Sequence, residues 1–179
     1  MFRDKENLSK PRQIAAGAML TALALALSYT ERFIPLQLLI PLPGVKLGLA
    51  NIVTLFALYF WGAGQALGIL VLRCFLGAVF GGGITGLLFS LTGGLLALGV
   101  MTLTRRIPGL SIYGVSILGA AAHNIGQIAA AVLLMHSVYV AAYLPWLLLV
   151  SLLTGSLMAF CAAGCFRGLL SAGFRPTTS

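Results

Sequence analysis

The chain has 179 residues, of which 60% are hydrophobic and 8% are charged, and its mean hydropathy is +1.05. This composition excludes a water-soluble domain and predicts a polytopic membrane protein built as one domain over residues 1–179. The formal net charge is +8, but the basic residues stand at the ends of apolar stretches. That placement is typical of membrane topology signals, so we do not expect nucleic acid as a partner.

Six apolar stretches follow a polar N-terminal tail, residues 1–12, and they predict an all-α bundle of six transmembrane helices. The predicted helices cover about residues 13–30, 46–60, 65–80, 84–103, 112–135 and 146–166. Glycine-rich or proline-containing breaks separate most of them, at residues 62–64, 81–83 and 108–109. The three cysteines lie inside apolar stretches without enough neighbouring ligands for a metal, so we expect no metal and no other cofactor.

The loop at residues 31–45 is unusual because it is both apolar and rich in proline. It contains three of the seven prolines, Pro35, Pro41 and Pro43, and therefore cannot continue as one helix. An apolar, irregular loop that leads into the next helix predicts a segment folded over a cavity.

The basic residues predict which side of the membrane each end faces. Six spans would place eight of the eleven Lys and Arg residues on the side of the two termini and only Arg32 and Lys46 on the other side, with Arg73 inside a span. The positive-inside rule then predicts a multi-pass protein of the cell membrane with both termini in the cytoplasm. The loop at 31–45 would lie outside the cell.

Arg73 lies near the middle of the third predicted span, where a charge is costly unless it is paired or faces a cavity. Glu31 is the only acidic residue outside the N-terminal tail. A contact with substrate and a structural pair with Glu31 both satisfy this cost, and the sequence leaves the two open.

Further polar side chains gather in two other places. His123, Asn124 and Gln127 fall within about one and a half turns of the fifth span, and the first and last share a face. Hydrogen bonds between helices would explain one or two polar side chains in such a stretch. Three polar side chains this close together favour a binding site. Lys46, predicted at a helix start, and Asn51 add groups that favour an anionic ligand, although a lysine there can also reach the headgroups.

Ala18, Ala22 and Ala26 repeat at a spacing of four along the first span. Small residues at that spacing allow another helix to approach closely. The spacing does not distinguish a partner protein from packing inside the chain's own bundle.

These features together resemble a known family. The alanine-striped first helix, the proline loop, the stretch PGVKLGLANIVTLFAL and the later AAAHNIGQ are similar to heptaprenyl diphosphate synthase component I, also called the Gx transporter family. That family resembles the substrate-binding S components of energy-coupling-factor (ECF) transporters. The resemblance implies six helices, a pocket near the outer face, and docking of the alanine stripe on a transmembrane T component driven by two ATPases.

The two family names imply different functions, and the acidic residues bear on the choice. Prenyl synthases bind diphosphate through magnesium on paired aspartate-rich motifs, whereas this chain has only Asp4, Glu6 and Glu31. It also lacks a P-loop. We therefore expect no catalysis by this chain alone and predict a substrate-binding subunit of an ECF-type importer. Two alternatives stay open: a non-catalytic accessory subunit in prenyl diphosphate or quinone synthesis, and a structural membrane subunit of a redox assembly.

Overall fold

The computed structural model describes residues 10–33 and 46–171, and all the regular secondary structure in this part of the chain is helical, without strands. Its elements are α1 (Lys10–Thr30), η1 (Glu31–Phe33), α2 (Asn51–Phe60), α3 (Ala63–Gly77), η3 (Ala78–Gly82), α4 (Gly83–Thr104), α5 (Ile112–Met135), η4 (Val138–Tyr143) and α6 (Leu144–Ser171). The all-α prediction is confirmed. Most of the polar tail and of the proline loop lies outside the described residues.

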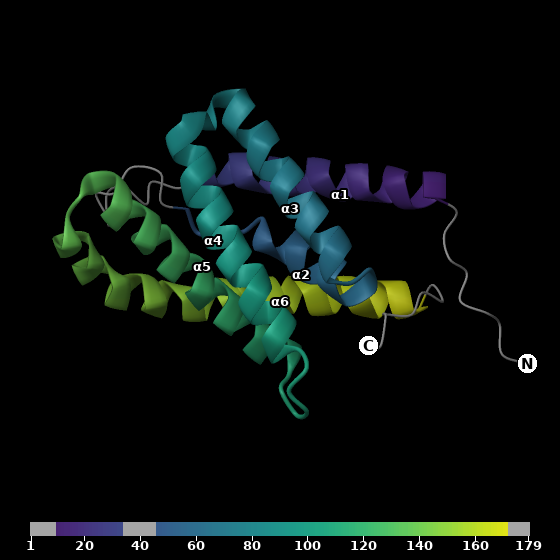
Figure 1. Cartoon of the computed structure of the whole chain (residues 1–179). Helices are drawn as coiled ribbons and strands as arrows, with labels where there is room; N and C mark the ends of the chain where they lie inside the picture. The colour runs from purple at the N-terminus through teal and green to yellow at the C-terminus, as the bar shows by residue number, and fades with distance from the viewer. Residues whose placement is uncertain (1–9, 34–45, 172–179) are drawn as a thin grey trace, which may run out of the picture.

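Four segments are long and apolar enough to cross a membrane: Pro11–Thr30, Ala63–Thr104, Ile112–Met135 and Val138–Gly168. The second of these has 42 residues and runs through α3, η3 and α4. It bends at Phe80 and Gly81, where the φ of Gly81 is 111°, so that α3 and α4 form a hairpin (Figure 1). The glycine-rich break predicted near this position therefore reverses the chain.

The second predicted span is shorter than expected. Helix α2 has only ten residues, or about 15 Å of length, which is half of a hydrocarbon core of about 30 Å. It begins at Asn51, and residues 46–50 precede it as a non-helical segment. The expectation that Lys46 starts a helix is wrong, because Gly48 has a positive φ of 81° that a helix does not accommodate.

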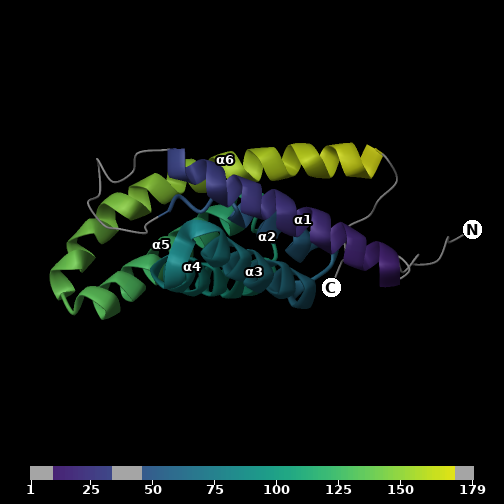
Figure 2. The same cartoon turned by 90° about the horizontal axis from the view of Figure 1, so that it is seen from above.

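Short as it is, α2 occupies the centre of the molecule (Figures 1 and 2). It contacts α1, α3, α4, α5 and α6, and most of its side chains are buried in the larger apolar core. The most extensive helix contacts join α4 to α5 and α5 to α6. Residues next to α2 in the sequence are therefore held by several helices at once.

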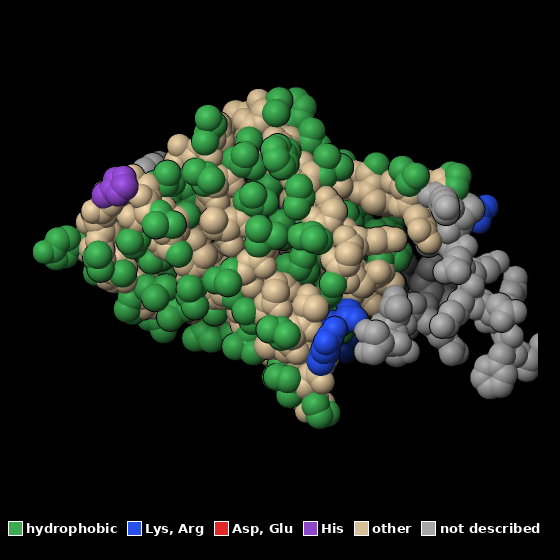
Figure 3. All heavy atoms as spheres, viewed as in Figure 1, with side chains coloured by type: hydrophobic (Ala, Val, Ile, Leu, Met, Phe, Trp, Pro, Cys, Tyr) green, Lys and Arg blue, Asp and Glu red, His purple; other side chains and the backbone are tan. Residues whose placement is uncertain are grey.

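The surface is mostly apolar, as expected of a protein whose solvent is lipid (Figure 3). The Lys and Arg side chains visible in Figure 3 lie in two places, near the beginning of α1 and near the end of α4. The beginning of α1 and the end of α6 lie at the same end of the molecule in both ribbon views.

Candidate functional site

The non-helical segment at residues 46–50 connects three helical elements through polar contacts. The backbone N–H of Lys46 donates to Gln127 Oε1 in α5 at 3.2 Å, and its Nζ donates to Ser90 Oγ in α4 at 3.1 Å. The N–H of Ala50 donates to Glu31 Oε1 in η1 at 3.3 Å. The two buried side chains Gln127 and Glu31 thus accept from backbone N–H groups of this segment.

Gly48 fits this segment closely against α5. Besides its positive φ, a Cβ at this position would lie 2.9 Å from His123 Cδ2 and 3.0 Å from Asn51 Nδ2. Its carbonyl accepts from the N–H of Asn51 at 2.8 Å, at the start of α2. Only glycine meets both the backbone and the space requirement here.

The His123 ring lies between Gly48 and Gly93 of α4, because a Cβ on Gly93 would come within 2.8 Å of His123 Nδ1. Its Nε2 is 2.9 Å from Gln127 Nε2. Since Gln127 Oε1 accepts from Lys46, the Nε2 of Gln127 is the donor and His123 Nε2 is the acceptor. We therefore assign a neutral imidazole that carries its proton on Nδ1.

Arg73 and Asn51 form the cationic side of the same cluster. Both are buried, at 5% and 3% exposure, and Arg73 Nη2 donates to Asn51 Oδ1 at 3.1 Å. Arg73 Nε, Asn51 Nδ2 and the nearby Thr54 Oγ1 have no hydrogen-bond partner in the described part of the chain. The side chains of the cluster therefore do not satisfy all of its own donors. Each unsatisfied buried donor costs about 1–3 kcal/mol.

Glu31 is the only carboxylate among the described residues, and it is 4% exposed. Burial raises the pKa of Glu31, and the charges of Lys46 and Arg73 together with the N–H groups of Leu49 and Ala50 act in the opposite direction. The Arg73 guanidinium thus acts on Glu31 through space, while its described hydrogen bond goes to Asn51. The cluster contains two cations and one carboxylate.

Five of the six predicted binding residues come together in this cluster: Lys46, Asn51, Arg73, His123 and Gln127. Asn124 does not join it in any described contact, because its Nδ2 donates to the carbonyl of Leu147 in α6 at 2.8 Å. Sequence reasoning missed Gly48 and Ser90. The family-like stretch PGVKLGLAN contains Gly48 and could have indicated it, whereas a single serine in an apolar helix gives no signal.

No group of three or more His, Cys, Asp or Glu side chains within the described ranges could hold a metal ion.

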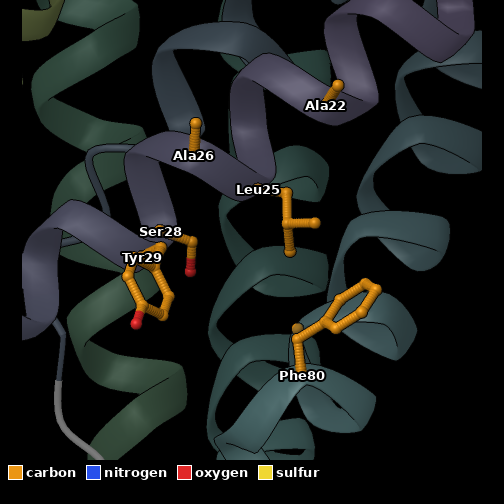
Figure 4. Close-up of a pocket in the computed structure, with 7 residues that line it drawn as sticks. Ala22, Leu25, Ala26, Ser28, Tyr29 and Phe80 are labelled. Atoms are coloured by element: carbon orange, nitrogen blue, oxygen red, sulfur yellow. The ribbon is translucent and has the colours of Figure 1, made fainter.

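The predicted alanine stripe lies on the surface. Ala18, Ala22 and Ala26 are exposed, while Thr21 and Ala24 on the same helix are buried. Beside the stripe a groove of about 400 Å³ is lined by Ala22, Leu25, Ala26, Ser28, Tyr29, Gly77 and Phe80. In Figure 4 Leu25 and Phe80 point toward one another, whereas Ala22 and Ala26 point away from Phe80. The stripe is therefore not used for packing within the described bundle.

Comparison with known proteins identifies the family. A family model described as heptaprenyl diphosphate synthase component I matches residues 20–165, well over half of the chain. No curated protein and no solved structure matches. The matched range contains every residue of the buried cluster and two of the three stripe alanines. Together with the apolar, membrane-length helices, this match shows that the chain is a membrane protein belonging to the heptaprenyl diphosphate synthase component I family.

Proposed function

We propose that this protein is the substrate-binding membrane subunit of an ECF-type importer and that it captures a small anionic molecule at the Lys46–Arg73 cluster. The observation that carries this proposal is the pair of buried donors, Arg73 Nε and Asn51 Nδ2, that have no acceptor. A purely structural network normally satisfies its buried polar groups. A ligand with acceptor oxygens would complete this one.

The exposed stripe on α1 supports the partner in this proposal. Ala18, Ala22 and Ala26 leave the surface of α1 smooth and available to a second transmembrane protein. That protein would be a T component that works with a pair of ATPases. The bias of the basic residues toward one end supports six spans in the cell membrane with both termini in the cytoplasm.

The proposed role is non-catalytic. Chemistry on a diphosphate through magnesium needs several carboxylates, and one buried carboxylate already accepts a backbone hydrogen bond. Glu31 alone does not supply such a set of ligands. The protein would bind and release its ligand unchanged.

Ligand capture is tested by native mass spectrometry of the gently purified protein. A small molecule should co-purify with the wild type, and Arg73→Gln should reduce its occupancy at least ten-fold, because a charge-assisted hydrogen bond contributes about 1.5–3 kcal/mol. Arg106→Gln is the matched control, since it removes the same charge from an exposed position. Equal occupancy in the wild type and in Arg73→Gln would contradict capture at this cluster.

Docking is tested by Ala22→Trp, which places a large side chain on the stripe. The isolated variant should stay folded and retain its ligand, yet fail to co-purify with a T component and fail to support uptake. Leu153→Trp is the control, because it adds the same side chain at an exposed position of α6. Normal assembly and uptake with Ala22→Trp would exclude α1 as the contact.

The family description favours one second candidate, an accessory subunit in prenyl diphosphate or quinone synthesis. Affinity purification from the native membrane separates the two. A T component with ATPases would support the importer, and a prenyl synthase without them would support the accessory role.

A further inference from the structure

We propose, resting on the proposed function, that Thr54 is a specificity-determining residue of the ligand site and that its hydroxyl hydrogen-bonds a second polar group of the ligand. Anion capture by Arg73 and Asn51 does not itself require Thr54. The side chain of Thr54 is fully buried, at 0% exposure, and its Oγ1 has no hydrogen-bond partner among the described residues. Burying a hydroxyl without a partner is unfavourable, so a partner from outside the chain would remove a cost.

The hydroxyl of Thr54 does not form the hydrogen bond that its own helix offers. Five other threonines of the described helices donate to the carbonyl four residues earlier, at 2.7–3.1 Å: Thr21, Thr92, Thr102, Thr104 and Thr154. The corresponding carbonyl for Thr54 belongs to Ala50, whose backbone is helical, with φ −62° and ψ −15°. The same local bond is therefore open to Thr54, and its absence leaves the hydroxyl available to a different partner.

Thr54 stands beside the two donors that the anion-capture proposal uses. It shares a face of α2 with Asn51, because residues three apart are neighbours on a helix. Asn51 in turn accepts from Arg73 of α3. Since Asn51 Nδ2 and Arg73 Nε also have no partner, three unsatisfied polar groups come from this one face of α2 and the adjoining side chain of α3.

The polar side chains of α5 are engaged elsewhere. Gln127 uses its Oε1 for the N–H of Lys46 and its Nε2 for His123. The unsatisfied Nδ1 of His123 lies against Gly93 of α4, and Asn124, whose Oδ1 is also unsatisfied, bonds to the backbone of α6. We therefore place the ligand against α2 and α3.

The position of Thr54 bears on the chemical class of the ligand. Thr54 lies three residues, or about 4.5 Å, further along α2 than Asn51. A hydroxyl both donates and accepts, so its partner can be a hydroxyl, an amine, an amide or a carbonyl. The ligand is then a small molecule with an acceptor group and a second polar group roughly 4–5 Å from it, rather than a hydrocarbon chain with a single polar end.

The probe for this inference is the polar small-molecule extract of the native cells. It is added to purified protein in detergent that native mass spectrometry has shown to be free of bound molecules. The wild type should take up a molecule from the extract. Thr54→Val replaces the hydroxyl with a methyl group and should lower its occupancy about five-fold at a sub-saturating dilution, because a neutral hydrogen bond contributes about 1 kcal/mol.

Two variants control for the change of side chain. Thr54→Ser keeps the hydroxyl and should retain most of the occupancy. Thr21→Val makes the same change at another buried threonine, whose hydroxyl already donates to the carbonyl of Gly17, and it should leave the occupancy unchanged.

Thermal unfolding of the same ligand-free protein tests for a purely structural role. Thr54→Val should unfold at a temperature equal to or above that of the wild type, because it removes a buried hydroxyl that nothing satisfies. A lower unfolding temperature would show that the hydroxyl has a partner within the protein, and it overturns the inference.

The outcomes separate this inference from the proposed function. Equal occupancy in the wild type and Thr54→Val, with loss in Arg73→Gln, overturns the role of Thr54 and leaves anion capture intact. If the wild type takes up no molecule, anion capture is overturned as well. If Thr54→Val does not fold, Thr54→Ala is compared with Thr54→Ser, since these differ by the hydroxyl alone, and equal occupancy in that pair overturns the inference.

Discussion

Substituting Gly48 with alanine should destabilise the protein more than any other single added methyl group in the 46–50 segment. Its φ of 81° is unfavourable for alanine and costs about 1–3 kcal/mol. The new Cβ would also lie 2.9 Å from His123 Cδ2 and 3.0 Å from Asn51 Nδ2, and such overpacking costs about 1–3 kcal/mol. The two effects together should lower the free energy of unfolding by about 2–6 kcal/mol.

Three other glycines separate the two effects. Gly109 has a φ of 87° and open space around a Cβ, so Gly109→Ala should cost the backbone strain alone. Gly93 has a helical backbone, but its Cβ would lie 2.8 Å from His123 Nδ1, so Gly93→Ala should cost the steric contact alone. Gly68→Ala meets neither problem and should stabilise α3 by about 0.5–1 kcal/mol.

The measurement is reversible unfolding of the four variants in mixed detergent micelles, with the mass of any co-purified molecule recorded in parallel. Gly48→Ala and Gly93→Ala should both lose bound ligand, because both displace His123. If Gly48→Ala costs no more than Gly109→Ala, Gly48 does not pack on His123, and the placement of the 46–50 segment against α5 is refuted.

Three further predictions follow from topology and from the cluster. Single cysteines placed at Gly82 and Gly109 should be labelled from opposite sides of the membrane, Gly82 from outside; labelling of both from one side would end the six-span model. The double variant Glu31→Gln with Arg73→Gln should be more stable than the sum of the two single changes implies, because each single change leaves the other charge less compensated; simple additivity would show that the two charges do not interact. Asn124→Ala should lower the free energy of unfolding by about 1 kcal/mol without loss of ligand, since its described bond goes to the α6 backbone; loss of ligand at unchanged stability would place this side chain in the site.

The sequence predicted the long helices and their breaks because both depend on local features. Hydropathy and length indicate α1, α4, α5 and α6, and glycine indicates the bend between α3 and α4. The spacing of His123 and Gln127 was also enough to predict that they lie together, since residues four apart share a helix face. In the structure these two side chains interact. Asn124 is one residue, or about 100°, further around α5 than His123, and it consequently turns to α6.

The start of α2 could not be predicted in the same way. Residues 46–50 are apolar apart from Lys46 and continue without a break into the helix, so a hydropathy pattern extends the helix to include them. What keeps them non-helical is tertiary: the contact between Lys46 and Gln127 joins residues 81 positions apart. Local propensity carries no information about such a contact.

The polar residues of the cluster serve two needs that the structure allows us to distinguish. Irregular backbone is tolerated at membrane depth only where the protein satisfies its polar groups or where it lines a cavity. Gln127 and Glu31 meet the first need, because their oxygens accept from Lys46 and Ala50. Arg73 satisfies no described backbone group, and it retains an unpaired donor, as does its partner Asn51. Stabilising this segment alone would not require a buried arginine with an unused donor. A ligand that accepts from both Arg73 and Asn51 would satisfy these donors and would explain why the arginine is buried here.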